Sequence, residues 1–367
     1  MWIISLFLAL LLVALLQVWV FGRYGLRKFR YQRSFTPVVV NEGDTVTMVE
    51  TIRNEKLLPL PWVRIEAGIS SYLVFGDKNQ QADGARQYHR SIFALGPYST
   101  VTRRHRVYCA HRGYYQIRNV AAATGDLLGL ARVRAQEIET DSLVVVYPRL
   151  IPIEDILSEK NSFTGDIVVR RWIVDDPFMI RGVRAYTGSE PYNRINWKAT
   201  ARTGEMQVHE YDFTAEVRLL IVVNIDVTAE QWSAVIEEHR AERALALAAS
   251  IAQYALENGI ETGFATNGRL LEDRETVAYV PPQSGDSQVT EIFDTIAKIT
   301  LVRTLSMGTL LQQIVGYGVD NLDVLLITPY TDELMDRQIA DMRAAGNYVE
   351  ILSPDAWLDM EEGGTDA

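Results

Sequence analysis

Cysteine and positive charge are both scarce in this sequence. Cys109 is the only cysteine among 367 residues, so no intrachain disulfide can form. The 36 lysines and arginines are outnumbered by 47 aspartates and glutamates, which gives a net charge of −11. A general nucleic-acid-binding protein needs a basic surface to neutralise phosphates. The composition therefore predicts a protein with no nucleic-acid partner.

Motifs for zinc, nucleotides and serine nucleophiles are also absent. The five histidines have no HxH or HExxH spacing, and one cysteine cannot make a CxxC pair. The sequence has no GxxxxGK[ST] loop, no GxGxxG after a strand and no GxSxG elbow. His105, Cys109 and His111 share one face of a predicted strand, but strand geometry alone places alternate residues together. This pattern fits a buried thiol better than a nucleophile.

A long apolar run occupies residues 2–21, where Ser5 and Gln17 are the only polar side chains. Twenty residues of α-helix rise about 30 Å, which is enough to cross a bilayer core. The run has neither the basic segment before it nor the small-residue cleavage site after it that a signal peptide needs. We therefore expect residues 1–22 to be an uncleaved, single-pass transmembrane anchor.

The charges that follow this run predict its orientation. Five cations come before the first acidic residue, Glu42, and they are Arg23, Arg27, Lys28, Arg30 and Arg33. The positive-inside rule then places the N-terminus outside and the body of the protein in the cytoplasm. We expect residues 23–34 to form a basic juxtamembrane linker. The same cations could also bind anionic lipid headgroups, but the membrane topology already accounts for their presence.

The remaining chain changes character near residue 214. Residues 35–150 contain short β-rich runs separated by turns, such as 99–109 and 142–148, which predict an antiparallel β-sandwich. Residues 214–352 alternate apolar strands with helical patterns, which predict an α/β domain with a mostly parallel sheet. Its expected strands are 217–226, 260–266, 322–329 and 347–352, and its expected helices are 232–258, 286–298, 307–316 and 333–345. Residues 353–367 form an acidic tail.

The segment between these domains, 151–213, carries a cationic stripe. A helix is expected to begin near Ser189 or Glu190, with Pro191 in its first turn, and to end at Gly204. Six residues make up the candidate anion- or partner-binding site: Arg181, Arg184, Arg194, Trp197, Lys198 and Arg202. Arginine forks suit carboxylates and phosphates. The alternative is that the cations pair internally and that Trp197 packs in a core.

A candidate metal loop follows the first strand of the α/β domain. Asp226 and Thr228 form a D-x-T pair, the start of a D-x-S-x-S loop that could hold Mg²⁺ through oxygen ligands. Position 230 is Glu rather than Ser. The alternative is a helix-capping box made by Thr228 and Gln231, which needs no metal. Asp332 could add a carboxylate if its loop folds toward Asp226.

Residues 181–213 resemble the signature of the bacterial "domain of unknown function 58" proteins. The matching positions are Arg181, Val183, Arg184, Tyr186, Gly188, Arg194, Ile195, Trp197, Ala201, Arg202, Val208 and Glu210. The runs PLPW, RGYY and DLLGL look like the β-rich region that precedes this signature. Two positions depart from it: Ser189 stands where the family has Asp, and Asn193 where it has Arg.

The resemblance implies a membrane-anchored protein with a β-sandwich and a von Willebrand factor A-like (Rossmann-type) α/β domain. Such proteins are associated with MoxR-type AAA+ ATPases and with chaperone-like or cell-envelope work. No catalytic residue can be carried over from the family. We therefore expect a non-enzymatic adaptor or scaffold that needs no cofactor. The alternative is a divalent-metal-dependent hydrolase or phosphoryl-transfer enzyme that uses Asp226 and the arginine-rich segment.

Overall fold

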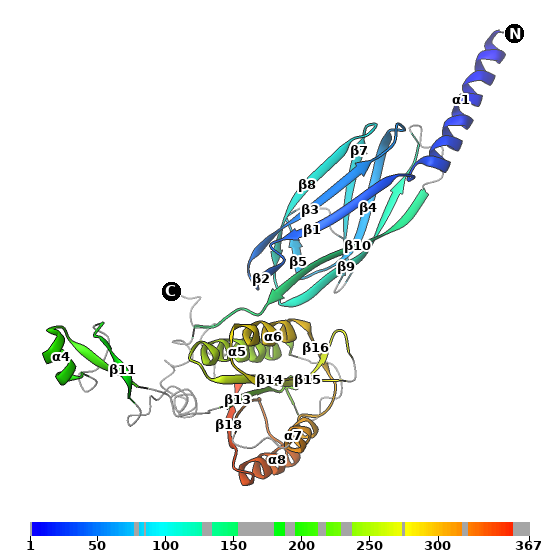
Figure 1. The fold of residues 1–367 in the computed structure, drawn as a ribbon. Helices are drawn as coiled ribbons and strands as arrows, with labels where there is room; N and C mark the ends of the chain where they lie inside the picture. The colour runs from blue at the N-terminus through cyan, green and yellow to red at the C-terminus, as the bar shows by residue number, and fades with distance from the viewer. Residues whose placement is uncertain are drawn as a thin grey trace, which may run out of the picture. The chain divides into compact units, whose positions relative to one another are not determined.

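A computed structural model describes most of the chain (Figure 1). The described residues are 2–76, 81–83, 86–126, 134–152, 180–187, 195–211, 218–228, 237–273, 276–317 and 322–354. Contacts within the chain divide it into two compact units, Met1–Arg149 and Leu150–Ala367. Each unit is described by itself below.

The first unit begins with helix α1, Trp2–Tyr24, which is long and apolar enough to cross a membrane. Most of its large side chains are exposed, as they must be if lipid is to cover them. Its last turns contact the β structure that follows: Phe21 is buried, and Gln17 donates a hydrogen bond to Asp126 over 2.8 Å. The predicted helix over 2–21 is therefore present and extends three residues further.

Two β-sheets with a shared hydrophobic core make up the rest of the first unit. Their strands are β1 (Phe29–Thr36), β2 (Val39–Asn41), β3 (Thr45–Asn54), β4 (Leu60–Ser70), β5 (Leu73–Phe75), β6 (Gln81–Asp83), β7 (Arg86–Leu95), β8 (Thr100–Cys109), β9 (Gly113–Thr124) and β10 (Arg134–Tyr147). One sheet has the order β1-β3-β8-β5 and the other β2-β10-β9-β4-β7-β6. Neighbouring strands are antiparallel except for the parallel pair β2 and β10. This arrangement is the predicted β-sandwich.

Strand β1 corrects the expected linker over residues 23–34. It starts at Phe29 and pairs with β3 along its whole length. Tyr31, Arg33 and Phe35 alternate toward the core, with polar or exposed neighbours between them. The positive charges of this stretch obscure a strand pattern with a period of two residues. Only residues 25–28 separate α1 from β1.

The second unit contains an α/β sheet whose order is β15-β14-β13-β17-β18. Its elements are β13 (Arg218–Val223), α5 (Glu238–Glu257), β14 (Glu261–Leu270), β15 (Val277–Gln283), α6 (Asp286–Lys298), β16 (Ile299–Arg303), α7 (Met307–Gly316), β17 (Asp323–Ile327), α8 (Glu333–Ala344) and β18 (Tyr348–Leu352). Strands β14, β13, β17 and β18 are parallel. Helices α5 and α6 cover one face of the sheet, and α7 and α8 cover the other (Figure 1).

The predicted helices and parallel strands of this sheet are confirmed, with ends that differ by a few residues. The sequence did not predict β15 and β16, which both run antiparallel to β14. Helix α5 begins at Glu238 with Glu237 at its N-cap, so Thr228 does not cap it. Gln231 and the start of the predicted helix lie outside the described residues, as does most of the acidic tail.

A small hairpin forms the described part of the cationic segment. Strand β11, Ile180–Ala185, pairs with β12, Gln207–Tyr211, and helix α4, Trp197–Thr203, lies between them in sequence. The helix ends as predicted at Gly204, which has a positive φ of 76°. The predicted start is wrong, because Asn196 caps the helix by accepting a hydrogen bond from the Ala199 amide. Residues 188–194 lie outside the described part of the chain.

Candidate functional site at the carboxyl edge of the α/β sheet

Buried polar side chains meet where the parallel strands β13, β14 and β17 end. Asn224 and Asp226 follow β13, Asn267 belongs to β14 and Thr328 follows β17. All four residues are at least 98% buried. Ligands of open α/β sheets bind at this carboxyl edge, so these residues define the candidate site.

A hydrogen-bond network fixes Asp226 in place. Asn267 Nδ2 donates to Asp226 Oδ2 and to Asn224 Oδ1, each over 3.0 Å. Asn224 Nδ2 donates to Thr328 Oγ1 over 3.0 Å, and the Ile225 amide donates to Asn267 Oδ1 over 2.9 Å. The amide side chains therefore use both their donors and their acceptors within the protein. Such a satisfied network is rigid and holds the carboxylate in one orientation.

The cation nearest to Asp226 is Arg303, at the end of β16. Its Nη1 atom lies 3.4 Å from Asp226 Oδ2, and the Arg303 side chain is 21% exposed whereas that of Asp226 is 1% exposed. Burial raises the pKa of the Asp226 carboxyl, although the charge of Arg303 and hydrogen bonds from Arg303 and Asn267 act in the opposite direction. The pairing of β16 with β14 brings Arg303 here, and the sequence pattern did not predict that pairing.

The described residues of the predicted metal loop, which end at Thr228, do not by themselves provide a set of ligands for Mg²⁺. Mg²⁺ needs several oxygen ligands in a near-octahedral geometry. Asp226 offers one oxygen, Oδ1, that has no hydrogen-bond partner among the described residues, while Oδ2 already faces Asn267 and a guanidinium. Thr228 is exposed, and Asp332 caps α8 by accepting from the Met335 amide.

The cationic stripe is only partly described. Lys198 and Arg202 are four residues apart on α4 and exposed, which places them on one helical face. Arg184 is exposed on β11 and donates to the Ala185 carbonyl over 3.2 Å. Arg194 and the side chain of Arg181 lie outside the described residues. Helix α4 starts at Trp197, so the structure describes only Lys198 and Arg202 of the predicted helical stripe.

Trp197 does not pack in a core, so that part of the alternative interpretation is wrong. Its side chain is 66% exposed, and none of the residues of α4 is buried. The buried apolar contact of this hairpin is made by Ile195 and Val208, which form a β-bridge. An exposed tryptophan beside exposed cations suits a binding surface.

Cys109 is a buried thiol, as its place in the strand pattern predicts. Burial, with a smaller contribution from the charge of Asp44, raises its pKa to about 11. The thiolate form that a nucleophile needs is therefore rare at neutral pH. His105 turns into the core, and the ring of His111 packs against Tyr72 at a centroid distance of 4.5 Å.

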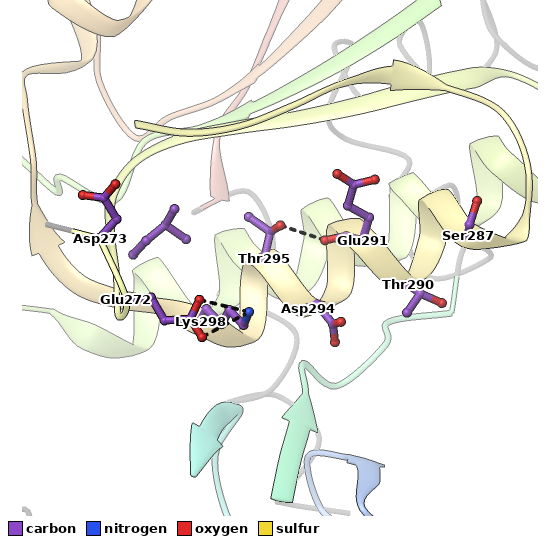
Figure 2. A pocket seen from close by; sticks show the side chains of 9 residues that line it. Glu272, Asp273, Ser287, Thr290, Glu291, Asp294, Thr295 and Lys298 are labelled. Carbon is purple, nitrogen blue, oxygen red and sulfur yellow. Dashed lines mark hydrogen bonds and ion pairs between the residues drawn. The ribbon is translucent and has the colours of Figure 1, made fainter. Parts of the chain in front are cut away.

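A surface pocket of about 470 Å³ lies beside α6 and the end of β14 (Figure 2). Its lining includes the acids Glu272, Asp273, Glu291 and Asp294 and one cation, Lys298, which pairs with Glu272 over 3.4 Å. None of the predicted site residues lines it. Exposed acids of this kind are common on an acidic protein, so the carboxyl edge stays the stronger candidate.

Comparison with known proteins supports the resemblance seen in the signature. Residues 182–315 match the family "Protein of unknown function DUF58". A curated relative, "Uncharacterized protein YeaD" of Bacillus subtilis (strain 168), is 24% identical over 246 residues. The match covers 67% of this chain and 58% of that relative, so the chain spans less than two thirds of its length.

Solved structures share only local similarity with this chain. A non-cellulosomal cohesin from Archaeoglobus fulgidus has a TM-score of 0.21 and 9% identity, over 32% of this chain and 91% of the cohesin. A CARDB domain from Pyrococcus furiosus has a TM-score of 0.19 and 13% identity, over 30% of this chain and 93% of that domain. Similarity at this level carries no functional argument.

Proposed function

We propose that this protein is a membrane-anchored, non-enzymatic adaptor whose α/β unit, a von Willebrand factor A-like domain, binds a protein partner. The observation that carries the proposal is the Asp226–Arg303 pair at the carboxyl edge of the sheet. A MoxR-type AAA+ ATPase is the partner that the family resemblance suggests. The work would then be chaperone-like or concern assembly of the cell envelope.

The chemistry of the pair favours binding over catalysis. The polar side chains around Asp226 are occupied in holding one another, and no nucleophile with an adjacent general base is present there among the described residues. Arg303 is partly exposed and presents a guanidinium, which suits an acidic side chain of a partner. The network holds Asp226 in place, and Asp226 in turn keeps Arg303 at the carboxyl edge of the sheet.

Binding of the full chain to the purified ATPase in detergent tests this function. We expect Arg303→Gln to weaken the complex about tenfold or more, since one charge-assisted contact is worth about 1.5–3 kcal/mol. Arg218→Gln is the matched control, because Arg218 lies at the opposite end of the same sheet and makes an exposed pair with Glu261 over 3.8 Å. Absence of any ATPase binding, or equal weakening by both variants, would contradict the proposal.

The alternative function is a metal-dependent hydrolase or phosphoryl-transfer enzyme. One observation favours it: Asp226 Oδ1 is buried and has no hydrogen-bond partner among the described residues. This enzyme would bind Mg²⁺ or Mn²⁺, and Asp226→Asn would abolish the binding. Calorimetry with millimolar Mg²⁺ tests the enzyme, because that function requires the ion to bind. Partner binding through Arg303 requires no metal ion at Asp226 and should be unchanged by a chelator.

The proposed orientation places the N-terminus outside, and the β-sandwich and the α/β unit in the cytoplasm. It rests on the apolar helix α1 and on the cations at its C-terminal end and beyond, beginning with Arg23 in its last turn. Reporter fusions at the C-terminus test it directly. We expect fluorescence from green fluorescent protein and no alkaline phosphatase activity, and the reverse pattern would overturn the orientation.

A further inference from the structure

Glu50 breaks the apolar pattern of strand β3 in the sandwich. The inward-facing positions around it are Val46, Met48 and Ile52, yet Glu50 is also fully buried. Removing a carboxylate from water is costly unless hydrogen bonds or a cation replace the lost hydration. The contacts of Glu50 therefore show what the interior of the sandwich is built to hold.

The two oxygens of Glu50 have different surroundings. Oε1 accepts hydrogen bonds from Tyr31 Oη over 2.6 Å and from Arg33 Nη2 over 2.8 Å. Oε2 accepts from Ser91 Oγ over 3.0 Å and also faces His105 Nε2 at 3.3 Å and His89 Nε2 at 3.9 Å. One oxygen is thus anchored, and the other points at two imidazole nitrogens.

The imidazoles come from both layers of the sandwich. Glu50 on β3 and His105 on β8 belong to one sheet, whereas His89 on β7 belongs to the other. The His89 ring stacks on Phe75 at a centroid distance of 4.6 Å and makes an edge contact with His105 at 5.0 Å. These ring contacts restrict the rotation of His89 and His105.

The ligand atoms of Glu50, His89 and His105 all lie within 4.8 Å of one another. A tetrahedral zinc ion with bonds of about 2.0–2.2 Å requires its ligand atoms to be roughly 3.3–3.6 Å apart. The distance of 3.3 Å from Glu50 Oε2 to His105 Nε2 already meets this requirement. The distance of 3.9 Å to His89 Nε2 needs only a small closing movement.

We propose that Glu50, His89 and His105 form a binding site for a divalent transition metal such as Zn²⁺ between the two sheets of the sandwich. Two imidazoles and one carboxylate are ligands that suit zinc and its neighbours, and not Mg²⁺ or Ca²⁺, which prefer oxygen ligands. Tyr31 and Arg33 hold the oxygen of Glu50 that does not face the imidazoles, as outer partners of metal-binding carboxylates do. The ion would join the two layers.

The competing explanation is a metal-free polar network. His89 Nε2 lies 3.0 Å from Ser91 Oγ, and Arg33 already balances the charge of Glu50. A metal ion must compete with that hydrogen bond, and it gains less from a carboxylate that a guanidinium already neutralises. We therefore expect weaker binding than at cysteine-rich zinc sites. Metal binding is the outcome that distinguishes the two explanations.

Cobalt titration of the full chain in detergent, after removal of metals with a chelator, tests the site. We expect one equivalent of Co²⁺ to produce a saturable visible absorption band that Zn²⁺ abolishes. His89→Gln and His105→Gln should each remove the band. His239→Gln is the matched control, because His239 is exposed on α5 in the other unit, and it should leave the band unchanged. A folded wild-type chain with no saturable band would overturn the proposal.

X-ray absorption spectroscopy of the wild-type chain with one equivalent of Zn²⁺ keeps the proposal testable if a variant fails to fold. Two imidazole ligands and an oxygen ligand would support the site, whereas fewer than two imidazoles would overturn it. The result is independent of the proposed adaptor function, because the two sites lie in different units of the chain.

Discussion

Each unit of the protein has a buried carboxylate beside an arginine, and the pKa values of the two carboxylates shift in opposite directions. In the sandwich, burial alone would raise the pKa of Glu50, but the nearby imidazoles of His105 and His89, the charge of Arg33 and the hydrogen bond from Tyr31 hold that pKa well below its usual range. In the α/β unit, burial raises the pKa of Asp226, and Arg303 and Asn267 do not cancel that effect. Burial therefore does not decide ionisation by itself; the number and strength of the donors do.

The two arginines also differ in their distance from the carboxylate and in their exposure to solvent. Arg33 Nη2 lies 2.8 Å from Glu50 with neither side chain exposed, whereas Arg303 Nη1 lies 3.4 Å from Asp226 and reaches solvent. The first pair suits a fixed role in the interior. The second pair is looser and accessible, which suits an exchange of partners.

The largest effect is expected for Arg33→Met, which leaves Glu50 buried without its cation. Breaking a fully buried ion pair costs about 3–5 kcal/mol of unfolding free energy. Chemical denaturation of the full chain measures the loss in the sandwich. The double variant Arg33→Met with Glu50→Gln is the control and should regain part of that stability. A loss below about 1 kcal/mol in the single variant would contradict the buried pair.

Lowering the pH should change the stability around Glu50 and around Asp226 in opposite directions. Because the folded-state pKa of Glu50 is lowered, its stabilisation is present above its ordinary value of 4.5 and is lost as the pH falls below it. The folded-state pKa of Asp226 is raised, so the buried carboxylate destabilises the folded state at neutral pH. This cost decreases as the pH falls toward the ordinary pKa of an aspartate, 3.8. Hydrogen exchange on the full chain, read for each unit, measures both trends. Equal acid sensitivity around Glu50 and Asp226 would contradict the comparison.

Arg303→Gln should destabilise the α/β unit less than Arg33→Met destabilises the sandwich. It leaves Asp226 buried without its cation, but Asp226 can take up a proton and Arg303 is partly exposed. We expect a cost of about 1–2 kcal/mol, measured by denaturation. Adding Asp226→Asn should recover most of it. A cost equal to that of Arg33→Met would show that the two pairs have the same role.

The smallest effect is expected on the surface of α4. The double variant Lys198→Gln and Arg202→Gln should change the unfolding free energy by less than about 0.5 kcal/mol, because both side chains are exposed. Partner binding is measured beside stability. Unchanged folding with weakened ATPase binding would place α4 in the partner surface. Loss of folding would instead support internal pairing of the cations.

Local pattern was enough to predict much of the α/β unit. Helices α6 and α7 have the predicted ends because their apolar periodicity and capping residues, such as Ser306 before α7, agree with the tertiary packing. The apolar run of α1 is equally local. The predicted candidate Asp226 also lies at the carboxyl edge, since parallel strands bring their ends together.

What could not be predicted depends on contacts between distant strands. Arg303 reaches Asp226 through an antiparallel strand that has no strong pattern of its own, and Glu50 meets partners from β1, β7 and β8. The error at α4 had a different cause: residues spaced by four in sequence need not belong to one helix, and Ile195 forms a β-bridge with Val208 just before α4 begins. Asn196, a good N-cap, was the signal that could have placed the helix start.

The junction between α1 and the sandwich has a mechanical consequence. Phe21 in the last turn of α1 and Leu26 in the turn over residues 25–28 are both buried, and Gln17 is hydrogen-bonded to Asp126. Gly25 cannot gain a side chain without strain, because its Cβ would lie 2.5 Å from the Phe21 carbonyl oxygen. The connection between α1 and the sandwich is therefore short and has little conformational freedom. If α1 is held in a bilayer, a force applied to the sandwich is transmitted directly to the helix in the membrane, because no long flexible linker lies between them.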